Sequence, residues 1–387
     1  MRIALVGPLP IKDASKLLFE VDDGYFDLFA NDRGVSVLTT AKALLGRGHE
    51  VTLITTDRHT DQIEVFEKGT FRLVIVPRRR KLKSQVLDLY KRERSLLTKV
   101  IDADASQVVN AQWTYEYALA ALDSAKPVIV TVHDAPLSIF LKFRDFLRFL
   151  HLLIAIKVRL HNPKLIFVSP FIAEKWSREM LWKGQREIVP NIGLTFKSRE
   201  KNTAKLMRCI SVTESGRLKN TFALIESWPK VISICPDAVL TLVGHGLEYG
   251  GALQKLASSR GLDHRIEWLG FLDHERVLDE IANSALLIST SRQESFGLTL
   301  LEAMSLGVPV LAGANSGAPA WVLGDAGYLV NVKKPSEIAS GVIKILTDEK
   351  MQMKMATNGL TRSGSEFSVS VVCEKLEKIY SGLTSVG

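Results

Sequence analysis

Residues 284–311 read SALLISTSRQESFGLTLLEAMSLGVPVL, and apolar runs alternate here with polar and helical segments. The apolar run at 286–289 predicts a buried strand, and a polar loop follows it. Apolar residues then recur at helical spacing from Leu298 until Gly307 and Pro309 end the helix, and another apolar run occupies 308–311. A strand, a helix and a second strand in this order predict one unit of a parallel sheet covered by helices.

The same alternation extends over the whole chain. The predicted strands are 3–6, 51–54, 73–76, 107–110, 128–132, 165–168 and 187–189 in the first half, and 206–212, 239–243, 266–269, 286–289, 308–311 and 328–330 in the second. The polar residues 197–202 between the two sets carry no apolar period and are predicted to be a linker. We predict an α/β protein with two Rossmann-like, doubly wound domains facing a central cleft. The domains are predicted at 1–196 and 197–365, with a final helix at 366–387 that packs back towards the first.

Composition argues against several other classes of protein. No apolar window reaches the roughly 18 residues that a membrane-spanning helix needs. The first seven residues are too short for a secretion signal and predict a strand. Cys209, Cys235 and Cys373 lie far apart, which suits a reducing cytoplasm and argues against a disulfide framework or a zinc knuckle.

The loop and helix that follow residues 286–289 have the chemistry of an anion site. Gly297 permits close approach of the backbone, and the free N–H groups of Leu298 and Thr299 predict a diphosphate cradle at the positive end of the helix. Glu302 lies one turn later on the same helical face, and Glu294 precedes the helix, where it can accept hydrogen bonds from hydroxyls. Spacing alone equally allows an ordinary strand, loop and helix with two solvated glutamates.

The two glutamates, with Phe296-Gly297 between them and Ala303 after the second, resemble the EX7E segment of the retaining glycosyltransferases of family 4, which have the GT-B fold. The resemblance continues through residues 242–246, 268–272 and 307–310, and so covers most of the second half. It implies that Glu294 holds the donor sugar, that Glu302 holds the ribose hydroxyls, and that the backbone amides between them hold the phosphates. By register, it implies a nucleobase near Gly270, Phe271 and Leu272.

A second donor element is expected before the first helix of this domain. Lys219 matches the lysine of the family by its distance from the helix that starts near Phe222. Arg217 lies two residues before Lys219, whereas the arginine of the family lies five before it, at the position that Glu214 occupies here. Fixed cations would stabilise the charge that the leaving diphosphate gains. We predict that Arg217 replaces the usual arginine; the alternative is that it is solvated and that Lys219 acts alone with the helix N-terminus.

The first half resembles the acceptor domain of the family less closely. His133, at the end of the predicted strand 128–132, matches the histidine segment, which implies contact with the transferred sugar; a histidine after a strand can also be structural. Arg33 and Gly34 stand where the family usually has two glycines, which predicts a border of the acceptor site suited to an anionic acceptor. Two further departures are residues 110–113, Asn-Ala-Gln-Trp in place of paired histidines, and residues 317–320, which have alanine where glutamate is common.

The resemblance implies no metal or other cofactor, only a nucleoside-diphosphate sugar as co-substrate. Asp102 and Asp104 resemble the Asp-x-Asp metal site of the other glycosyltransferase fold. They precede the strand predicted at 107–110, away from the diphosphate cradle, and we interpret them as part of a solvated loop. No group of His, Cys, Asp or Glu has convincing metal-ligand spacing.

The whole net charge of +8 falls within residues 1–198. Residues 78–99 predict a helix with one basic face and one packed face, formed by Leu82, Val86, Leu89, Leu96 and Val100 at helical spacing. Residues 139–160 are apolar but interrupted by cations. The two stretches fit an anionic membrane surface as well as they fit a helix pair packed on the sheet. The nine cations of the first stretch are Arg78, Arg79, Arg80, Lys81, Lys83, Lys91, Arg92, Arg94 and Lys99. Nucleic acid is not an expected partner, because the cations lack interleaved stacking aromatics.

These observations predict an enzyme that moves a sugar to a hydroxyl acceptor with retention of anomeric configuration. The expected acceptor is a glycolipid, or a lipid-linked oligosaccharide or polysaccharide precursor, at the cytoplasmic face of a membrane. One alternative is an inactive nucleotide-sugar-binding or membrane-assembly protein, which the altered glycine loop and Glu214 suggest. Another is a transferase that acts on a soluble sugar or sugar phosphate.

Overall fold

A computed structural model describes residues 1–19, 24–29, 34–193 and 207–384. They belong to two compact units: unit 1 contains Met1–Ile192 and Val372–Gly387, and unit 2 contains Gly193–Val371. The boundaries expected from sequence were 196/197 and 365/366, whereas these divisions fall at 192/193 and 371/372. The linker predicted at 197–202 lies outside the described residues.

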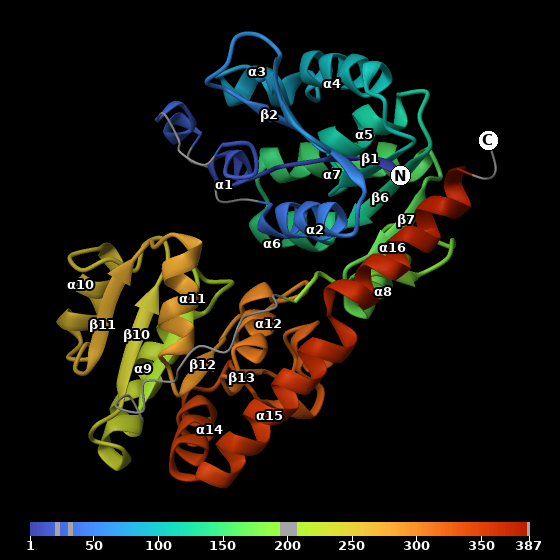
Figure 1. The fold of residues 1–387 in the computed structure, drawn as a ribbon. Coiled ribbons are helices and arrows are strands. Elements are labelled where there is room, and N and C mark those ends of the chain that lie inside the picture. Colours follow the sequence, from blue (N-terminus) through green and yellow to red (C-terminus); the bar gives the residue numbers. More distant parts are fainter. Residues whose placement is uncertain (20–23, 30–33, 194–206, 385–387) are drawn as a thin grey trace. The chain divides into compact units, whose positions relative to one another are not determined.

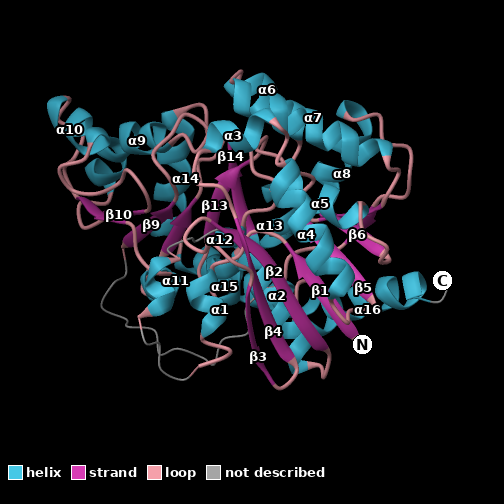
Figure 2. Ribbon diagram, turned by 90° about the horizontal axis from the view of Figure 1, so that it is seen from above, coloured by secondary structure: helices cyan, strands magenta, loops and turns pink. Residues whose placement is uncertain are grey.

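Unit 1 is built on an eight-stranded sheet in the order β3-β4-β2-β1-β5-β6-β7-β8. Figure 2 shows strands β3, β4, β2, β1 and β5 of this sheet side by side. The strands are β1 (Arg2–Val6), β2 (Glu50–Asp57), β3 (Glu64–Lys68), β4 (Phe71–Pro77), β5 (Val108–Gln112), β6 (Val128–Val132), β7 (Lys164–Phe167) and β8 (Glu187–Ile188). They pair in parallel, except that β3 is antiparallel to β4. Without β3, the order is that of a doubly wound sheet that grows outward in both directions from β1.

Helices cover both faces of this sheet (Figure 1). They are α1 (Ile11–Ser15), η1 (Tyr25–Leu28), α2 (Val35–Gly46), α3 (Leu82–Leu87), α4 (Lys91–Ala103), α5 (Glu116–Leu122), α6 (Pro136–Phe143), α7 (Phe146–Leu160), α8 (Pro170–Glu179) and the C-terminal α16 (Val369–Thr384). Gly34 precedes α2 with φ 83°, and a Cβ there would lie 2.0 Å from the carbonyl oxygen of Pro8. Only glycine therefore allows α2 to start this close to the loop after β1.

Unit 2 is a six-stranded, wholly parallel sheet in the order β11-β10-β9-β12-β13-β14. Its strands are β9 (Arg208–Val212), β10 (Val239–Val243), β11 (Ile266–Gly270), β12 (Leu286–Ile288), β13 (Val310–Gly313) and β14 (Gly327–Val330). Its helices are α9 (Thr221–Ile234), α10 (Ala252–Ser259), α11 (His274–Ala282), α12 (Leu298–Ser305), α13 (Pro319–Leu323), η2 (Gly324–Ala326), α14 (Pro335–Thr347) and α15 (Glu349–Glu366). Counted along the chain, this is the Rossmann order 3-2-1-4-5-6, whose switch point lies between β9 and β12.

The α/β prediction is confirmed, since every predicted strand is present. Strand β3, at one edge of the sheet of unit 1, was not predicted, because its pattern is largely polar and Val65 is 45% exposed. An edge strand need not be buried on both of its faces, and charged side chains are common in such strands.

The basic residues 78–99 form two helices rather than the single one predicted. Leu89 and Tyr90 have φ values of 53° and 60°, which separate α3 from α4. The buried face of α4 consists of Glu93, Leu97 and Ile101, whereas Leu96 and Val100, which the helical period had placed on that face, are half-buried. The side chains of Leu82, Lys83 and Val86 lie outside the described part.

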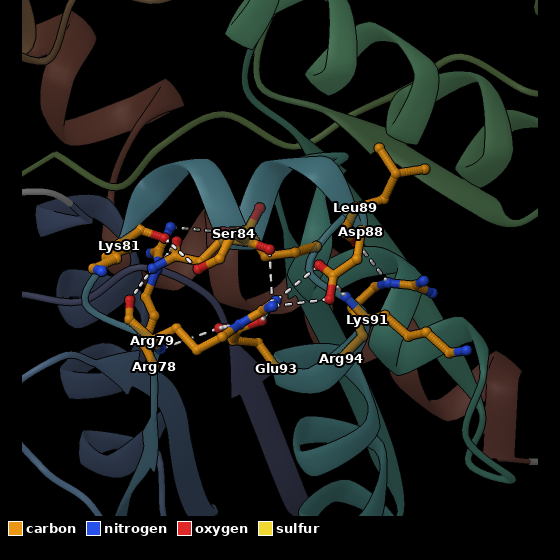
Figure 3. A network of polar contacts seen from close by, with 11 residues as sticks. Arg78, Arg79, Lys81, Ser84, Asp88, Leu89, Lys91, Glu93 and Arg94 are labelled. Carbon is orange, nitrogen blue, oxygen red and sulfur yellow. Dashed lines mark hydrogen bonds and ion pairs between the residues drawn. The ribbon is translucent and has the colours of Figure 1, made fainter.

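Several cations of this stretch are paired within unit 1. Arg79 lies 2.8 Å from Asp88 and 2.6 Å from the buried Glu93 (Figure 3). Arg94 pairs with Asp123 at 3.1 Å, and Arg78 lies over the Tyr90 ring. These guanidinium groups hold α3 and α4 in place, so this stretch offers a membrane less positive charge than its composition indicates.

Helix α16 packs on unit 1 through polar contacts that join distant parts of the chain. Glu377 accepts two hydrogen bonds from Arg47, at 2.7 and 2.9 Å, and lies 2.8 Å from His49 Nε2. The hydrogen bonds from Arg47 lower the pKa of Glu377 to about 2. The paired carboxylate therefore stabilises the folded unit above pH 4.5, its ordinary value, and this contribution is lost as the pH falls through about 2.

We expect Glu377→Gln to lower the free energy of unfolding at pH 7 by about 1 kcal/mol, because the pair is partly exposed. The difference from wild type should shrink as the pH falls from 4.5 towards 2. Urea unfolding at a series of pH values measures it, with Glu226→Gln on the exposed surface of unit 2 as the control. A difference independent of pH would contradict the role of the pair.

Candidate functional site

The loops that follow β9 and β12 meet at the switch point of unit 2. Arg292 donates from its backbone N–H to Leu218 O at 2.8 Å, and from Nε to Asn220 Oδ1 at 3.0 Å. Thr290 Oγ1 donates to Lys219 O at 3.1 Å. These bonds hold the residues before α9 against those before α12, and so bring together two donor elements that are distant in sequence.

Lys219 and Glu294 form an ion pair, with Nζ 3.0 Å from Oε2. The backbone of Glu294 is fixed on both sides, since its N–H donates to Ser316 O at 2.7 Å and its carbonyl accepts from Ala318 N at 3.1 Å. Both side chains remain partly exposed, at 33% for Lys219 and 21% for Glu294. A cation and an anion thus lie side by side at the surface of the switch point, on a rigid backbone.

The N-terminus of α12 is next to this pair. Gly297 has φ 94°, and a Cβ there would lie 2.7 Å from Leu300 Cδ1 and 3.4 Å from Glu294 Cγ. Within the described part of the chain, no group accepts a hydrogen bond from the N–H of Leu298 or Thr299, and no side chain caps the helix. The two amides and the helix dipole leave a position suited to an anion beside Lys219.

Glu302 faces a partner that the sequence analysis did not identify. His274, the first residue of α11, places Nε2 2.7 Å from Glu302 Oε1, and the carboxylate is 7% exposed. An N–H from the ring fixes one carboxylate oxygen, so the other can accept hydrogen bonds from a ligand. Nothing in the spacing of two residues 28 positions apart predicts this contact.

In the expected nucleobase region, two glycines bring the ends of β10 and β11 close together. Gly270 ends β11 with φ 65°, and Gly244, the residue after β10, donates its N–H to Gly270 O at 2.7 Å. Phe271, 52% exposed, stacks on His245 with the ring centroids 4.5 Å apart, and Leu272 is half-buried. The loops after β10 and β11 therefore form one surface with an aromatic edge.

Arg217 and Glu214 are both exposed on the loop after β9. Among the described residues no hydrogen bond or ion pair engages the guanidinium of Arg217, and the backbone carbonyl of Glu214 accepts from Thr221 Oγ1 at 3.2 Å. That Arg217 replaces the arginine of the family therefore stays a prediction.

In unit 1, His133 follows β6 and is held from two sides. Its Nε2 lies 2.8 Å from Gln112 Oε1, and its ring stacks on Trp113 at 4.1 Å between centroids. Burial lowers the pKa of His133 to about 3, so the imidazole is neutral near pH 7. Gly34 lies at the start of α2 in the same unit, and Arg33 lies outside the described residues.

The aspartates before β5 do not form the solvated loop that was predicted. Asp104 is 6% exposed, and its carboxylate accepts from Thr52 Oγ1 at 3.1 Å and from Arg72 Nη1 at 3.4 Å. Asp102 accepts from Ala125 N at 2.9 Å. Both carboxylates bind protein donors and serve the packing of unit 1. Sequence missed this because the partners come from β2, β4 and the turn before β6.

Two sequence families, one for each half, together match most of the chain. The family "Glycosyltransferase Family 4" matches residues 34–192, and "Glycosyl transferases group 1" matches residues 195–362. The N-acetyl-alpha-D-glucosaminyl L-malate synthase of Bacillus anthracis is 31% identical over 172 residues, which are 44% of each chain. A GDP-mannose-dependent phosphatidylinositol monomannoside mannosyltransferase of Corynebacterium glutamicum is 29% identical over 168 residues, 42% of this chain and 43% of that one. The chain thus spans less than half the length of these relatives.

Solved structures agree on the fold over the whole chain. Sucrose-phosphate synthase from Thermosynechococcus elongatus has a TM-score of 0.78 at 19% identity, with all of both chains covered. Anabaena HepE, solved in complex with UDP and glucose, has a TM-score of 0.70 at 15% identity, with 99% of this chain and 100% of that one covered.

The two doubly wound units and the likeness to these solved structures over the whole chain identify the fold as the GT-B fold of glycosyltransferases. Within that class, the chain belongs to the group 1 glycosyltransferases of family 4.

Proposed function

We propose that this protein transfers a sugar from a nucleoside-diphosphate sugar to a hydroxyl acceptor, with retention of anomeric configuration. The observation that carries the proposal is the Lys219–Glu294 pair at the switch point, next to the uncapped N-terminus of α12. A diphosphate accepts hydrogen bonds from the amides of Leu298 and Thr299 and is neutralised by Lys219. Glu294 is then within reach of the hydroxyls of the attached sugar.

During transfer, the bond from the anomeric carbon to the diphosphate breaks, a bond to the acceptor oxygen forms, and the acceptor hydroxyl passes its proton to the departing diphosphate. Negative charge grows on the diphosphate, so Lys219 and the helix amides bind the transition state more strongly than the bound donor. Arg217 adds a second cation if the exposed loop after β9 closes on the ligand. Glu302 binds the ribose, and Gly270, Phe271 and Leu272 border the base. In unit 1, His133 contacts the sugar, and Arg33 and Gly34 border the acceptor.

Names of similar proteins support a nucleotide-sugar donor. HepE was solved with UDP and glucose, and one relative is named as GDP-mannose-dependent. Neither fixes the base or the sugar for this chain, and we propose that no metal ion is required, because the cations of the protein neutralise the diphosphate.

A panel of UDP-, GDP-, ADP- and dTDP-sugars tests the proposal by thermal shift, followed by release of the nucleotide in the presence of a glycolipid extract. One nucleotide should raise the melting temperature by mass action and be turned over. A melting temperature that no nucleotide changes would refute the donor site. Binding without transfer or donor hydrolysis would instead favour an inactive nucleotide-sugar-binding protein.

We further propose a lipid-linked acceptor, reached by a protein that binds the inner face of the cytoplasmic membrane. Among the described residues, no helix combines the length and apolar character needed to cross a membrane. Where α6 ends and α7 begins, however, apolar side chains are exposed beside cations. Leu141 is 56% exposed, Phe143 48% and Phe146 62%, with Arg144 and Arg148 between and after them. Aromatic and cationic side chains together suit the boundary between head groups and acyl chains.

We expect the double variant Phe143→Ser, Phe146→Ser to weaken binding to vesicles of phosphatidylglycerol, by roughly tenfold for each ring that enters the acyl boundary. Co-sedimentation with the vesicles measures it. Ile234→Ser is the matched control, because Ile234 is 60% exposed in unit 2. If the wild type ignores these vesicles, the membrane proposal is wrong, and a soluble sugar or sugar phosphate becomes the preferred acceptor.

A further inference from the structure

A buried polar cluster of unit 1 connects α16 to His133. It contains Asn110 and Gln112 of β5, Thr131 of β6 and Tyr380 of α16, which are exposed by 7% or less. Asn110, Gln112, Thr131 and His133 also line one pocket of unit 1. Asn110 and Gln112 belong to the segment in which the sequence departs from the paired histidines of similar enzymes.

The hydrogen bonds of the cluster have a defined direction. Asn110 Oδ1 accepts from Thr131 Oγ1 at 2.7 Å and from Gln112 Nε2 at 2.9 Å. Asn110 Nδ2 donates to the Tyr380 hydroxyl oxygen at 2.7 Å. Because the amide nitrogen of Gln112 points to Asn110, its carbonyl oxygen is the atom that faces His133.

The direction of these bonds determines where His133 carries its proton. Gln112 Oε1 can only accept, so His133 Nε2, 2.8 Å away, must carry a hydrogen. Since burial keeps the pKa of His133 near 3, the neutral ring has no second proton and Nδ1 is left as an acceptor. Trp113 adds a second restraint: its backbone has φ 62°, unusual for a residue with a side chain, and its indole lies against the imidazole.

We propose that Tyr380, Asn110 and Gln112 form a relay that holds His133 in the Nε2–H tautomer, so that Nδ1 accepts a hydrogen bond from a hydroxyl of the substrate. The three are positioning residues that act through His133. The role of the relay in catalysis rests on the proposed sugar transfer, whereas the tautomer itself does not. The relay also selects a substrate class, because a lone pair at Nδ1 attracts a hydroxyl and repels a carboxylate; a uronate should be rejected where the hydroxymethyl sugar is accepted.

The tautomer is read in the full-length protein, labelled with 15N-histidine, without any ligand. We expect His133 to show a protonated, pyrrole-type Nε2 and an unprotonated, pyridine-type Nδ1 at pH 7. Gln112→Glu should keep this tautomer and raise the pKa of His133, because a carboxylate also accepts from Nε2. Gln112→Leu should release it to a mixture of tautomers. Lys378→Ala, an exposed position of α16, should change nothing.

Tyr380→Phe tests the far end of the relay, since it removes the acceptor for Asn110 Nδ2 without altering His133 or its neighbours on β5. A shift of the tautomer equilibrium in this variant supports the relay. If Nδ1 carries the proton in the wild type, both amides are oriented the other way and the proposal is overturned, whether or not the protein transfers sugar. It is equally overturned if the tautomer stays unchanged in both Gln112→Leu and Tyr380→Phe.

The kinetic measurement uses the donor that the nucleotide panel selects; for a uridine donor, UDP-glucose is compared with UDP-glucuronate. We expect the wild type to prefer the hydroxymethyl sugar, and Gln112→Leu to lower kcat about tenfold with little change in KM for the donor. In Gln112→Glu, kcat should fall as the pH drops through the raised pKa of His133, which a purely structural role would not produce. A wild type with the expected tautomer that turns over no donor leaves the relay standing and refutes the proposed function instead.

Discussion

Replacing Lys219 with alanine is expected to lower kcat for sugar transfer by about 10²–10³-fold, the usual effect of removing one group that stabilises developing negative charge. In the free protein Lys219 Nζ lies 3.0 Å from Glu294 Oε2, beside the open amides of α12. These amides remain in the variant, so the diphosphate still binds, but the charge that appears as the sugar leaves is no longer neutralised. The loss should therefore fall mainly on kcat, with a smaller change in the dissociation constant of the donor.

Steady-state kinetics with the donor chosen by the nucleotide panel measure this effect. Lys230→Ala is the matched control, because Lys230 is an exposed lysine of α9, the helix that follows Lys219. The control should leave kcat unchanged. If Lys219→Ala retains kcat within a factor of about three, less than the loss of one charged hydrogen bond would produce, this cation does not act on the leaving group.

Glu302→Ala is expected to weaken binding of the nucleotide by roughly 10- to 100-fold, which corresponds to the loss of hydrogen bonds to a charged acceptor. Glu302 is 7% exposed, and one of its oxygens is fixed by His274 at 2.7 Å. The other oxygen is therefore oriented before the ligand arrives, and little freedom is lost on binding. Removing the carboxylate also leaves the ring of His274 without this acceptor.

Isothermal titration with the nucleoside diphosphate, and with its 2′,3′-dideoxy form, identifies which part of the ligand is involved. The dideoxy ligand should bind the wild type about as weakly as the normal ligand binds Glu302→Ala. For Glu302→Ala itself, the two ligands should have about the same dissociation constant. Glu275→Ala, an exposed glutamate on α11, is the control. A variant that loses the same factor for both ligands would show that Glu302 does not hold the ribose.

Much of the fold follows from local patterns along the chain. Each predicted strand is present because a buried parallel strand must be an apolar run, and such a run can be read without knowing its neighbours. The order of the strands in the sheets follows from the Rossmann-like prediction, and the edge strand β3 was missed because its exposed side chains lack that pattern. The basic stretch 78–99 was misread as one helix, since composition contains no information on left-handed residues such as Leu89 and Tyr90.

Part of the candidate site could likewise be predicted from the sequence, and part of it could not. Gly297, Glu294 and Glu302 could be selected because they lie within one strand–loop–helix segment, and that segment resembles a known family. The pairing of Lys219 with Glu294 required two segments 75 residues apart to meet, which the family resemblance implied and the sheet order explains. His274, by contrast, gave no local signal, and its role was missed.

The class of fold, the family and the loop that offers amides to an anion could be predicted, because they depend on patterns within a few turns of chain. The pairing of polar groups became visible only in the folded units: Asp104 with Arg72, His274 with Glu302, and Tyr380 with Asn110 at a separation of 270 residues. A hydrogen bond requires two atoms to lie within about 3 Å with the donor directed at the acceptor. Such positions are set by the packing of whole elements. The role of Asn110 and Gln112, which stand in place of the paired histidines of similar enzymes, can therefore be seen only when β5, β6 and α16 lie together.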